Sequence, residues 1–243
     1  MCSSDLLDSL RNGSLPQQVR VRTLAHLFLD PNKIPSNCSE CTDVPPAIPQ
    51  KVRELKHLPD RSLLLPGDLI LISPQKPSFI QRQIRKAQLA GGYSEEDAHW
   101  THAAVYLGFD FNICEATRKG VHQASLLDSL DTHLVRVRRD PTLDSDIRWK
   151  IAVAAALQIG TKYGIASALK IGFRSIKGLH NPQKAKTQSS NELICSELYA
   201  DAFLFATGKT LQDTQAMEVS PAFLSYVDYL EDVPLAWRKI PGR

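Results

Sequence analysis

Residues 101–117 read THAAVYLGFDFNICEAT and hold two short apolar runs around a turn. The runs Thr101–Leu107 and Phe111–Ala116 are built from β-branched, aromatic and small residues, which suit strands. Gly108–Asp110 between them has the composition of a turn. The stretch therefore predicts a β-hairpin near the middle of the chain.

A strand and a helix are predicted before this hairpin. Pro66-Gly67-Asp68 is a turn that opens the apolar run Leu69–Ile72, whose length and flanks indicate a short buried strand. Phe79–Ala90 has the pattern of a basic amphipathic helix, which ends at Gly91-Gly92.

The second half of the chain is predicted to be mostly helical. After a further strand at Leu134–Val137, we expect helices at Ile147–Ile159 and Ile165–Ile176. A last helix runs from about Glu192 to Ala206 and stops at Gly208; its apolar stripe is Leu198, Ala202, Phe205 and Ala206. Because the strands precede the helices instead of alternating with them, the order favours an α+β domain.

The N-terminal part of the chain differs from the rest. Asp30–Pro49 is rich in Pro, Ser and Asn and is predicted to be a loop, with helices at about Leu15–Leu29 and Lys51–Leu58. We interpret residues 1–60 as an N-terminal extension that packs on a domain formed by residues 61–243.

Composition narrows the class of protein. The chain has 243 residues, of which 43% are hydrophobic and 23% charged, so it can bury a core and is not a disordered chain. A net charge of +3 gives no argument for nucleic acid as a partner. No apolar run is long enough to span a bilayer, and we expect no Sec-type signal peptide. With five cysteines, an odd number, we expect reduced thiols and a cytoplasmic location in the producing cell.

Cys195 is the best candidate for a nucleophile. The sequence has no P-loop, GxGxxG, HExxH or GxSxG motif, but thiol catalysis needs only a cysteine, a histidine and a group that orients the histidine. Cys195 lies in ICSELY, early in the predicted helix, with residues 189–191 (Ser, Ser, Asn) available as caps. The start of a helix favours a thiolate. The alternative is a small buried apolar residue.

His102 and Glu115 are the candidate partners of this thiol. His102 would act as the base, and Glu115, which follows on the next strand of the hairpin, could orient the imidazole if the hairpin register allows. The alternatives are a structural histidine and an exposed glutamate at a strand edge. Weaker candidates for the orienting group are Asp97, Asp110 and Asp128.

Two further features carry less specific signals. Cys38 and Cys41 form a CxxC without a second ligand pair, so no metal site is expected. Residues 148–191 contain eight basic residues and no acidic one, which suits either an anionic substrate, polymer or membrane, or a solvated helical face.

Five segments in order resemble one family. They are LPGDLILI (65–72), WTHAAVYLG (100–108), ICEATRKGV (113–121), ICSELYADAF (194–203) and VSPAFLSYV (219–227). Together they resemble the circularly permuted branch of the NlpC-type papain-like superfamily, which includes the YiiX-like hydrolases and in which the histidine strand precedes the cysteine helix. The similarity covers about Leu63 to Tyr229, and the N-terminal extension has no counterpart in it.

The resemblance implies a fold and roles for single residues. It implies a papain-like α+β domain in which Cys195 is the nucleophile, His102 the base and Glu115 the orienting group, with no cofactor. Tyr163 corresponds to a tyrosine near the site, and Asp68 to a structural aspartate. ICSELY departs from the Asn-Cys-Glu-His-Phe type motif of the lecithin:retinol acyltransferase-like branch, which makes a lipid acyltransferase less favoured.

Three classes of function follow as expectations. The first is an amidase or endopeptidase acting on peptidoglycan peptides, including an antibacterial effector exported by a type VI-like secretion machine and countered by an immunity protein. The second is a hydrolase or acyltransferase acting on lipid esters, thioesters or amides. The third is a binding module that retains an inactive site.

Overall fold

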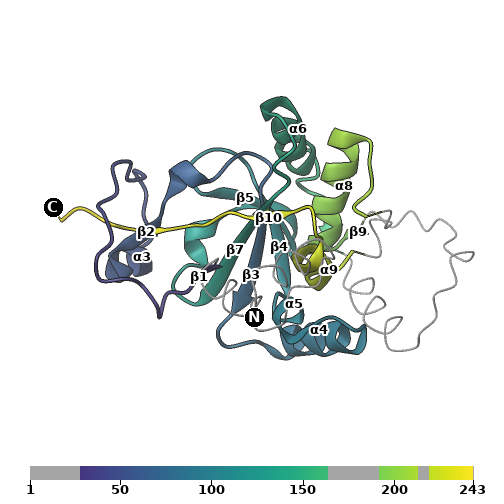
Figure 1. Cartoon of the computed structure of the whole chain (residues 1–243), viewed down its shortest axis with the longest axis horizontal. Helices are drawn as coiled ribbons and strands as arrows, with labels where there is room; N and C mark the ends of the chain where they lie inside the picture. The colour runs from purple at the N-terminus through teal and green to yellow at the C-terminus, as the bar shows by residue number, and fades with distance from the viewer. Residues whose placement is uncertain (1–27, 164–191, 213–218, 243) are drawn as a thin grey trace, which may run out of the picture.

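The computed structural model describes residues 28–163, 192–212 and 219–242. Within them, seven strands form one antiparallel sheet, whose main path runs in the order β1-β7-β3-β4-β5-β6, with β10 also paired to β7. Figure 1 shows this sheet at the centre of the molecule. The strands are β1 (Phe28–Leu29), β3 (Leu69–Pro74), β4 (His102–Tyr106), β5 (Asn112–Thr117), β6 (Gly120–Ser125), β7 (His133–Arg139) and β10 (Glu231–Asp232).

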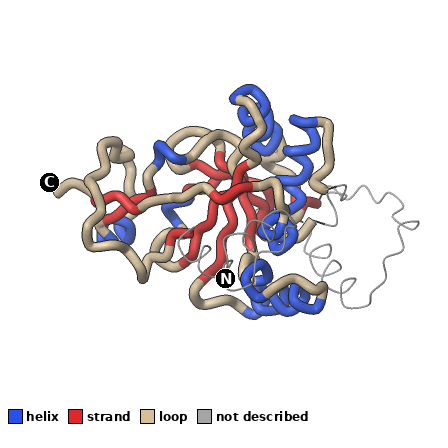
Figure 2. Tube along the Cα trace, viewed as in Figure 1, coloured by secondary structure: helices blue, strands red, loops and turns tan. Residues whose placement is uncertain are grey.

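Two helices cover one face of the sheet and enclose the first core. They are α6 (Ser145–Ala156) and α8 (Cys195–Thr207), which lie side by side in Figures 1 and 2. Alternate strand residues such as Leu69, Ala103 and Val105 pack against Leu198 and the other buried residues of α8. The sequence order predicted an α+β protein, and an antiparallel sheet packed against helices confirms that class.

The N-terminal residues help to enclose a second core on the other strand residues. Helix α3 (Gln50–Leu55) precedes β2 (His57–Pro59), which pairs with the C-terminal strand β11 (Trp237–Lys239). Figure 1 shows the C-terminal segment crossing the molecule to reach them. Val52, Leu58 and Trp237 are buried there with Ile70 and Val137 of the central sheet.

Helices α4 (Phe79–Ala90), α5 (Glu95–Ala98) and α9 (Pro221–Tyr226) complete the fold. The predicted helix Phe79–Ala90 is confirmed at both ends: a capping box of Ser78 and Gln81 begins it and Gly91 ends it. Gln88 on its inner face donates to the carbonyl oxygens of Ala98 and Trp100, which fixes the chain just before β4.

Several predicted elements were wrong in part. Helix α8 begins at Cys195, because Glu192–Leu193 form strand β9 beside β8 (Lys162–Tyr163). Phe205 is 71% exposed, so it does not belong to the buried stripe of α8. Strand β6 was not predicted.

The N-terminal predictions also need correction. Phe28–Leu29 form strand β1 and not the end of a helix, and the predicted helix Lys51–Leu58 is the shorter α3 followed by β2. The remainder of Leu15–Leu29, the predicted helix Ile165–Ile176 and the proposed caps at 189–191 lie outside the described residues.

Candidate active site

The hairpin register brings His102 and Glu115 together. Glu115 on β5 pairs with Ala104 on β4, and His102 lies two residues before Ala104, so both side chains project from the same face of the sheet. His102 Nε2 lies 2.6 Å from Glu115 Oε2. The Glu115 side chain is only 16% exposed, which excludes the alternative of a solvated strand-edge glutamate.

Cys195 is the first residue of α8 and reaches His102 from the start of that helix. His102 opens β4, so its ring lies at an end of the strand, where it interacts with the Cys195 thiol as well as with Glu115. Because Nε2 is taken by Glu115, Nδ1 is the ring nitrogen left for the sulfur. Cys195 itself is buried, with 6% of its surface exposed.

Three contacts fix the start of α8. The Glu197 carboxylate accepts from the backbone N–H of Ile194 at 3.1 Å, which caps the helix from inside its own first turn. Ser196 Oγ donates to the carbonyl oxygen of Val219 at 2.6 Å. Leu193, just ahead of the helix, pairs with Tyr163 in the short parallel ladder of β8 and β9. The thiol is thus held by a packed helix and a strand rather than by a free loop.

The charges of the site favour a protonated imidazole. Burial alone would lower the pKa of His102, but its hydrogen bonds and charge interactions with Cys195 and Glu115 raise that pKa to about 10. Burial also acts to raise the pKa of Glu115, yet the hydrogen bond from His102 and the nearby histidine charges hold it below its usual value. At neutral pH the imidazole is therefore a cation between two groups that can be anions.

A third group, which the sequence did not single out, contacts Glu115. His122 lies opposite Glu115 in the β5–β6 register, with its Nε2 3.3 Å from Glu115 Oε1. The contact could be predicted only from the strand pairing: once β6 is paired with β5, His122 falls on the same face of the sheet as Glu115. That pairing is not visible in GVHQAS alone.

Of the weaker sequence candidates, Asp97 and Asp110 bind other partners. Asp97 accepts from Ser225 Oγ at 2.7 Å, and Asp110 pairs with Arg61 at 2.8 Å.

Asp68 is buried and forms a two-fold ion pair with Arg139, with contacts of 2.6 and 2.7 Å, as suits a structural residue. Cys114 is buried, its thiol donates to the Ala155 carbonyl at 3.2 Å, and burial with the Glu115 charge raises its pKa to about 12.

The remaining predicted features are separate from the triad. The Cys38 and Cys41 thiols are free and donate to nearby backbone carbonyls. In the described part of the chain, no group of three His, Cys, Asp or Glu side chains is arranged to hold a metal ion. Most of the basic stretch 148–191 lies outside the described residues. No helix among those described has both the length and the apolar character needed to cross a membrane.

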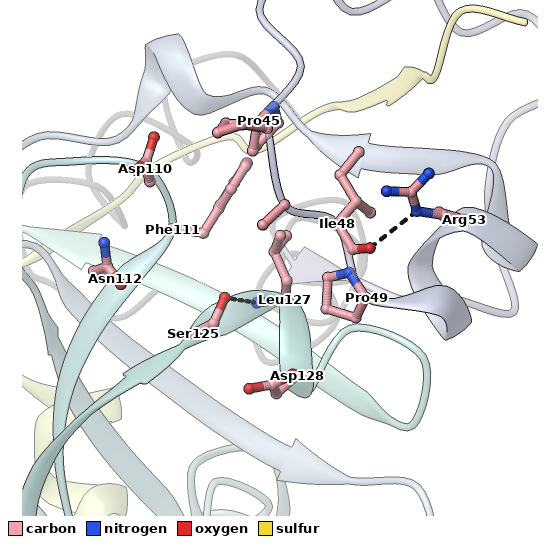
Figure 3. Close-up of a pocket in the computed structure, with 12 residues that line it drawn as sticks. Pro45, Ile48, Pro49, Arg53, Asp110, Phe111, Asn112, Ser125, Leu127 and Asp128 are labelled. Carbon is pink, nitrogen blue, oxygen red and sulfur yellow. Dashed lines mark hydrogen bonds between the residues drawn. The ribbon is translucent and has the colours of Figure 1, made fainter. Parts of the chain in front are cut away.

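A hollow of about 720 Å³ lies between the N-terminal residues and the β5–β6 pair (Figure 3). Pro45, Ile48 and Pro49 line it together with Phe111 and Leu127. Neither His102, Glu115 nor Cys195 lines this hollow, so it is a feature distinct from the triad.

The chain was compared with protein-family models and with curated proteins. No protein-family model matches the chain, and no curated protein matches it.

Proposed function

We propose that the chain is a thiol hydrolase that cleaves amide bonds through Cys195, His102 and Glu115. The observation that carries the proposal is the position of His102, whose ring interacts with the Cys195 thiol and whose Nε2 lies 2.6 Å from Glu115 Oε2. A nucleophile, a base and a group that orients the base, each within hydrogen-bond reach of the next, are what acyl transfer requires. The proposed fold is the permuted papain-like one, supported by the segment order and the antiparallel sheet beside the cysteine helix.

In the first half-reaction the Cys195 sulfur attacks the carbonyl carbon of the scissile amide. The C–S bond forms as the C=O electron pair moves to oxygen, and N–H groups in the first turn of α8, which have no partner within the helix, are suited to stabilise that oxyanion. The His102 imidazolium then protonates the leaving nitrogen as the C–N bond breaks. The products are a thioester on Cys195 and a free amine.

In the second half-reaction water releases the acyl group. Neutral His102 takes a proton from the water, whose oxygen attacks the thioester carbon, and the C–S bond breaks to return the thiolate. Glu115 stays ionised throughout: it holds the ring and stabilises its positive charge, as the low pKa of its carboxyl requires, although burial opposes that state.

For the substrate we propose the stem peptides of peptidoglycan. The segment resemblance to NlpC-type hydrolases supports this choice, and so does the excess of basic residues between 148 and 191, which would attract a polymer with free carboxylates. A chain with this target would act outside the producing cell, as an antibacterial effector does.

A specific observation favours lipid as a second candidate substrate. Trp149, Val153 and Leu157 recur every four residues from α6 onward and are 44%, 51% and 74% exposed, so they form an apolar row on one side of the molecule. Such a row is suited to contact a lipid surface, on which a hydrolase of lipid esters or amides acts.

One experiment tests both candidates. The purified protein is incubated with peptidoglycan and, separately, with phospholipid vesicles, and the products are identified by mass spectrometry. We expect release of wall peptides by the wild type and none by Cys195→Ala. Release of fatty acid without wall peptides would move the substrate to lipid. No product from either, with a Cys195 thiol inert to iodoacetamide, would overturn the hydrolase proposal.

A second experiment tests the proposed site of action. Export of the protein to the periplasm of a Gram-negative host, through an added signal peptide, should be toxic, and cytoplasmic production much less so. Cys195→Ala should be harmless in both compartments. Toxicity confined to the cytoplasm would contradict a peptidoglycan target.

A further inference from the structure

The Glu115 carboxylate has a histidine at each of its oxygens. Oε2 is 2.6 Å from His102 Nε2, and Oε1 is 3.3 Å from His122 Nε2. The two histidines come from the strands on either side of β5, so Glu115 is the central member of a row across three strands. The side chain of His122 is 32% exposed, the outermost of the three.

The contact of the second ring nitrogen, Nδ1, indicates which protonation state of His122 fits its environment. Its Nδ1 lies 3.0 Å from the carbonyl oxygen of Gly120. A carbonyl oxygen only accepts, so Nδ1 carries a proton, and a neutral ring would then present a bare lone pair to Glu115 Oε1. Two acceptors facing each other repel. Only the imidazolium, with a proton on each nitrogen, makes both contacts favourable.

We propose that His122 is a positioning residue of this site, whose protonated ring fixes the Glu115 carboxylate in the orientation that holds His102 against Cys195. The inference rests on the proposed function and adds a fourth member to its machinery. Burial acts to raise the pKa of Glu115, and His122 is one of the histidines whose charge interaction offsets that effect.

The surroundings of His122 supply no competing acid among the described contacts. Glu115 faces it from β5, and beyond Glu115 the charged or titratable groups are His102 on β4 and His133 on β7. Strands β8 and β9, which run beside β6, carry Lys162 and Glu192 in their sequences. Gly120, whose φ is +94°, lies where a Cβ would be 2.7 Å from the Thr161 carbonyl oxygen, so β6 is closely packed next to His122.

Two variants of His122 separate its two contacts. In His122→Gln the side-chain nitrogen takes the place of Nε2 and faces Glu115 Oε1, whereas in His122→Asn it takes the place of Nδ1 and keeps only the bond to Gly120. His57→Asn is the matched control, because His57 Nδ1 makes the same bond to a carbonyl two residues earlier, Leu55, at 2.9 Å, and lies on β2 outside the site.

The readout is the rate at which iodoacetamide alkylates Cys195 at pH 7, measured residue by residue by mass spectrometry. We expect His122→Asn to slow it roughly tenfold, the scale on which partners of functional side chains act. His122→Gln should stay within about threefold of the wild type on the same scale, and His57→Asn should not change the rate. Equal rates in all variants would overturn the proposal, and so would a loss with Gln but not Asn. Faster alkylation in both would show that the His122 charge opposes the His102 cation, which also overturns it.

A spectroscopic measurement tests the protonation of His122 independently of the reactivity of Cys195. ¹⁵N NMR of histidine-labelled protein shows which ring nitrogens carry protons. We expect both nitrogens of His122 to be protonated at pH 7, and the Nε2 proton to be lost in Glu115→Gln. A His122 ring protonated only on Nδ1 in the wild type, or one that Glu115→Gln leaves unchanged, would overturn the proposal. A wild-type Cys195 no more reactive than Cys38 would instead count against the proposed function, while these spectra would still decide the role of His122.

Discussion

Two charged clusters lie in the same sheet and are built from different chemistry. On β4, β5 and β6, Glu115 stands between two histidines, whose charge depends on pH. On β7, Arg136 binds Asp232 through two contacts of 2.5 and 2.9 Å and Ser225 Oγ at 2.6 Å. The first cluster is built around imidazole rings, which can accept and release a proton, whereas the guanidinium groups of the second keep their charge.

Exposure separates the two clusters as well. Arg136 and Arg138 are almost wholly buried, and Arg138 donates to the carbonyl oxygens of Leu224, Ser225 and Leu230, so the arginines tie the C-terminal residues to the sheet. The His102 side chain keeps 21% of its surface open. We infer that the arginine cluster serves stability, whereas the histidine cluster serves the proposed catalysis.

The largest expected effect is on activity in Cys195→Ala. Loss of the nucleophile should lower the rate of wall-peptide release at least about a thousandfold, and His102→Ala should be nearly as severe, because members of one catalytic unit fail together. Urea unfolding should show little change, since a thiol-to-methyl exchange at the start of α8 is small in volume. Cys114→Ala is the matched control and should stay active. Activity lost in Cys114→Ala and kept in Cys195→Ala would refute the assignment.

The arginine cluster should show the opposite pattern in Arg136→Met. Removing one partner of a buried ion pair leaves Asp232 with only the longer contact to Arg138 Nε at 3.8 Å, and should cost about 3–5 kcal/mol of the free energy of unfolding. Urea denaturation measures this loss, and the activity per folded molecule should be kept. Arg85→Met, which breaks an exposed pair with Glu95, should cost no more than about 1 kcal/mol. Similar losses in the two variants would mean that burial is not what distinguishes the Arg136 pair.

An intermediate effect is expected in Glu115→Gln. The amide keeps the shape of the side chain but removes the charge that stabilises the His102 imidazolium, so the rate should fall roughly 10- to 100-fold, less than in His102→Ala. Initial rates of both variants against the same substrate make the comparison. A loss in Glu115→Gln as deep as that in His102→Ala would show that Glu115 does more than orient and stabilise the ring.

The sequence predicted the local parts of this arrangement. The hairpin that carries His102 and Glu115 is confirmed, because two strands joined by a short turn depend on neighbouring residues alone. The helix Phe79–Ala90 is confirmed for the same reason: its cap and its stop lie within it or next to it.

The parts that were missed depend on distant partners. Strand β9 exists because Glu192–Leu193 pair with Lys162–Tyr163, which lie far back along the chain, so the helix starts later than its composition indicated. The cap seen at the start of that helix is Glu197, inside its first turn. His122 was missed because GVHQAS is a weak strand pattern, and its contact with Glu115 follows only from the register of β5 and β6.

The smallest and most specific effect concerns the pH dependence of Cys195 alkylation. The hydrogen bonds and charges of Cys195 and Glu115, which outweigh burial, raise the pKa of His102 to about 10, so the ring keeps its proton through neutral pH and loses it only as the pH rises through that value. An imidazolium beside the sulfur favours the thiolate, so the alkylation rate should change little between pH 7 and 9. An ordinary thiol should instead become faster as the pH approaches about 8.5 and passes it. Mass spectrometry of iodoacetamide-treated protein follows Cys195 and Cys38 in one sample. A Cys195 alkylation rate that rises in parallel with that of Cys38 would mean that the histidine cluster does not activate the Cys195 thiol. The histidine and arginine clusters would then differ only in their exposure to solvent.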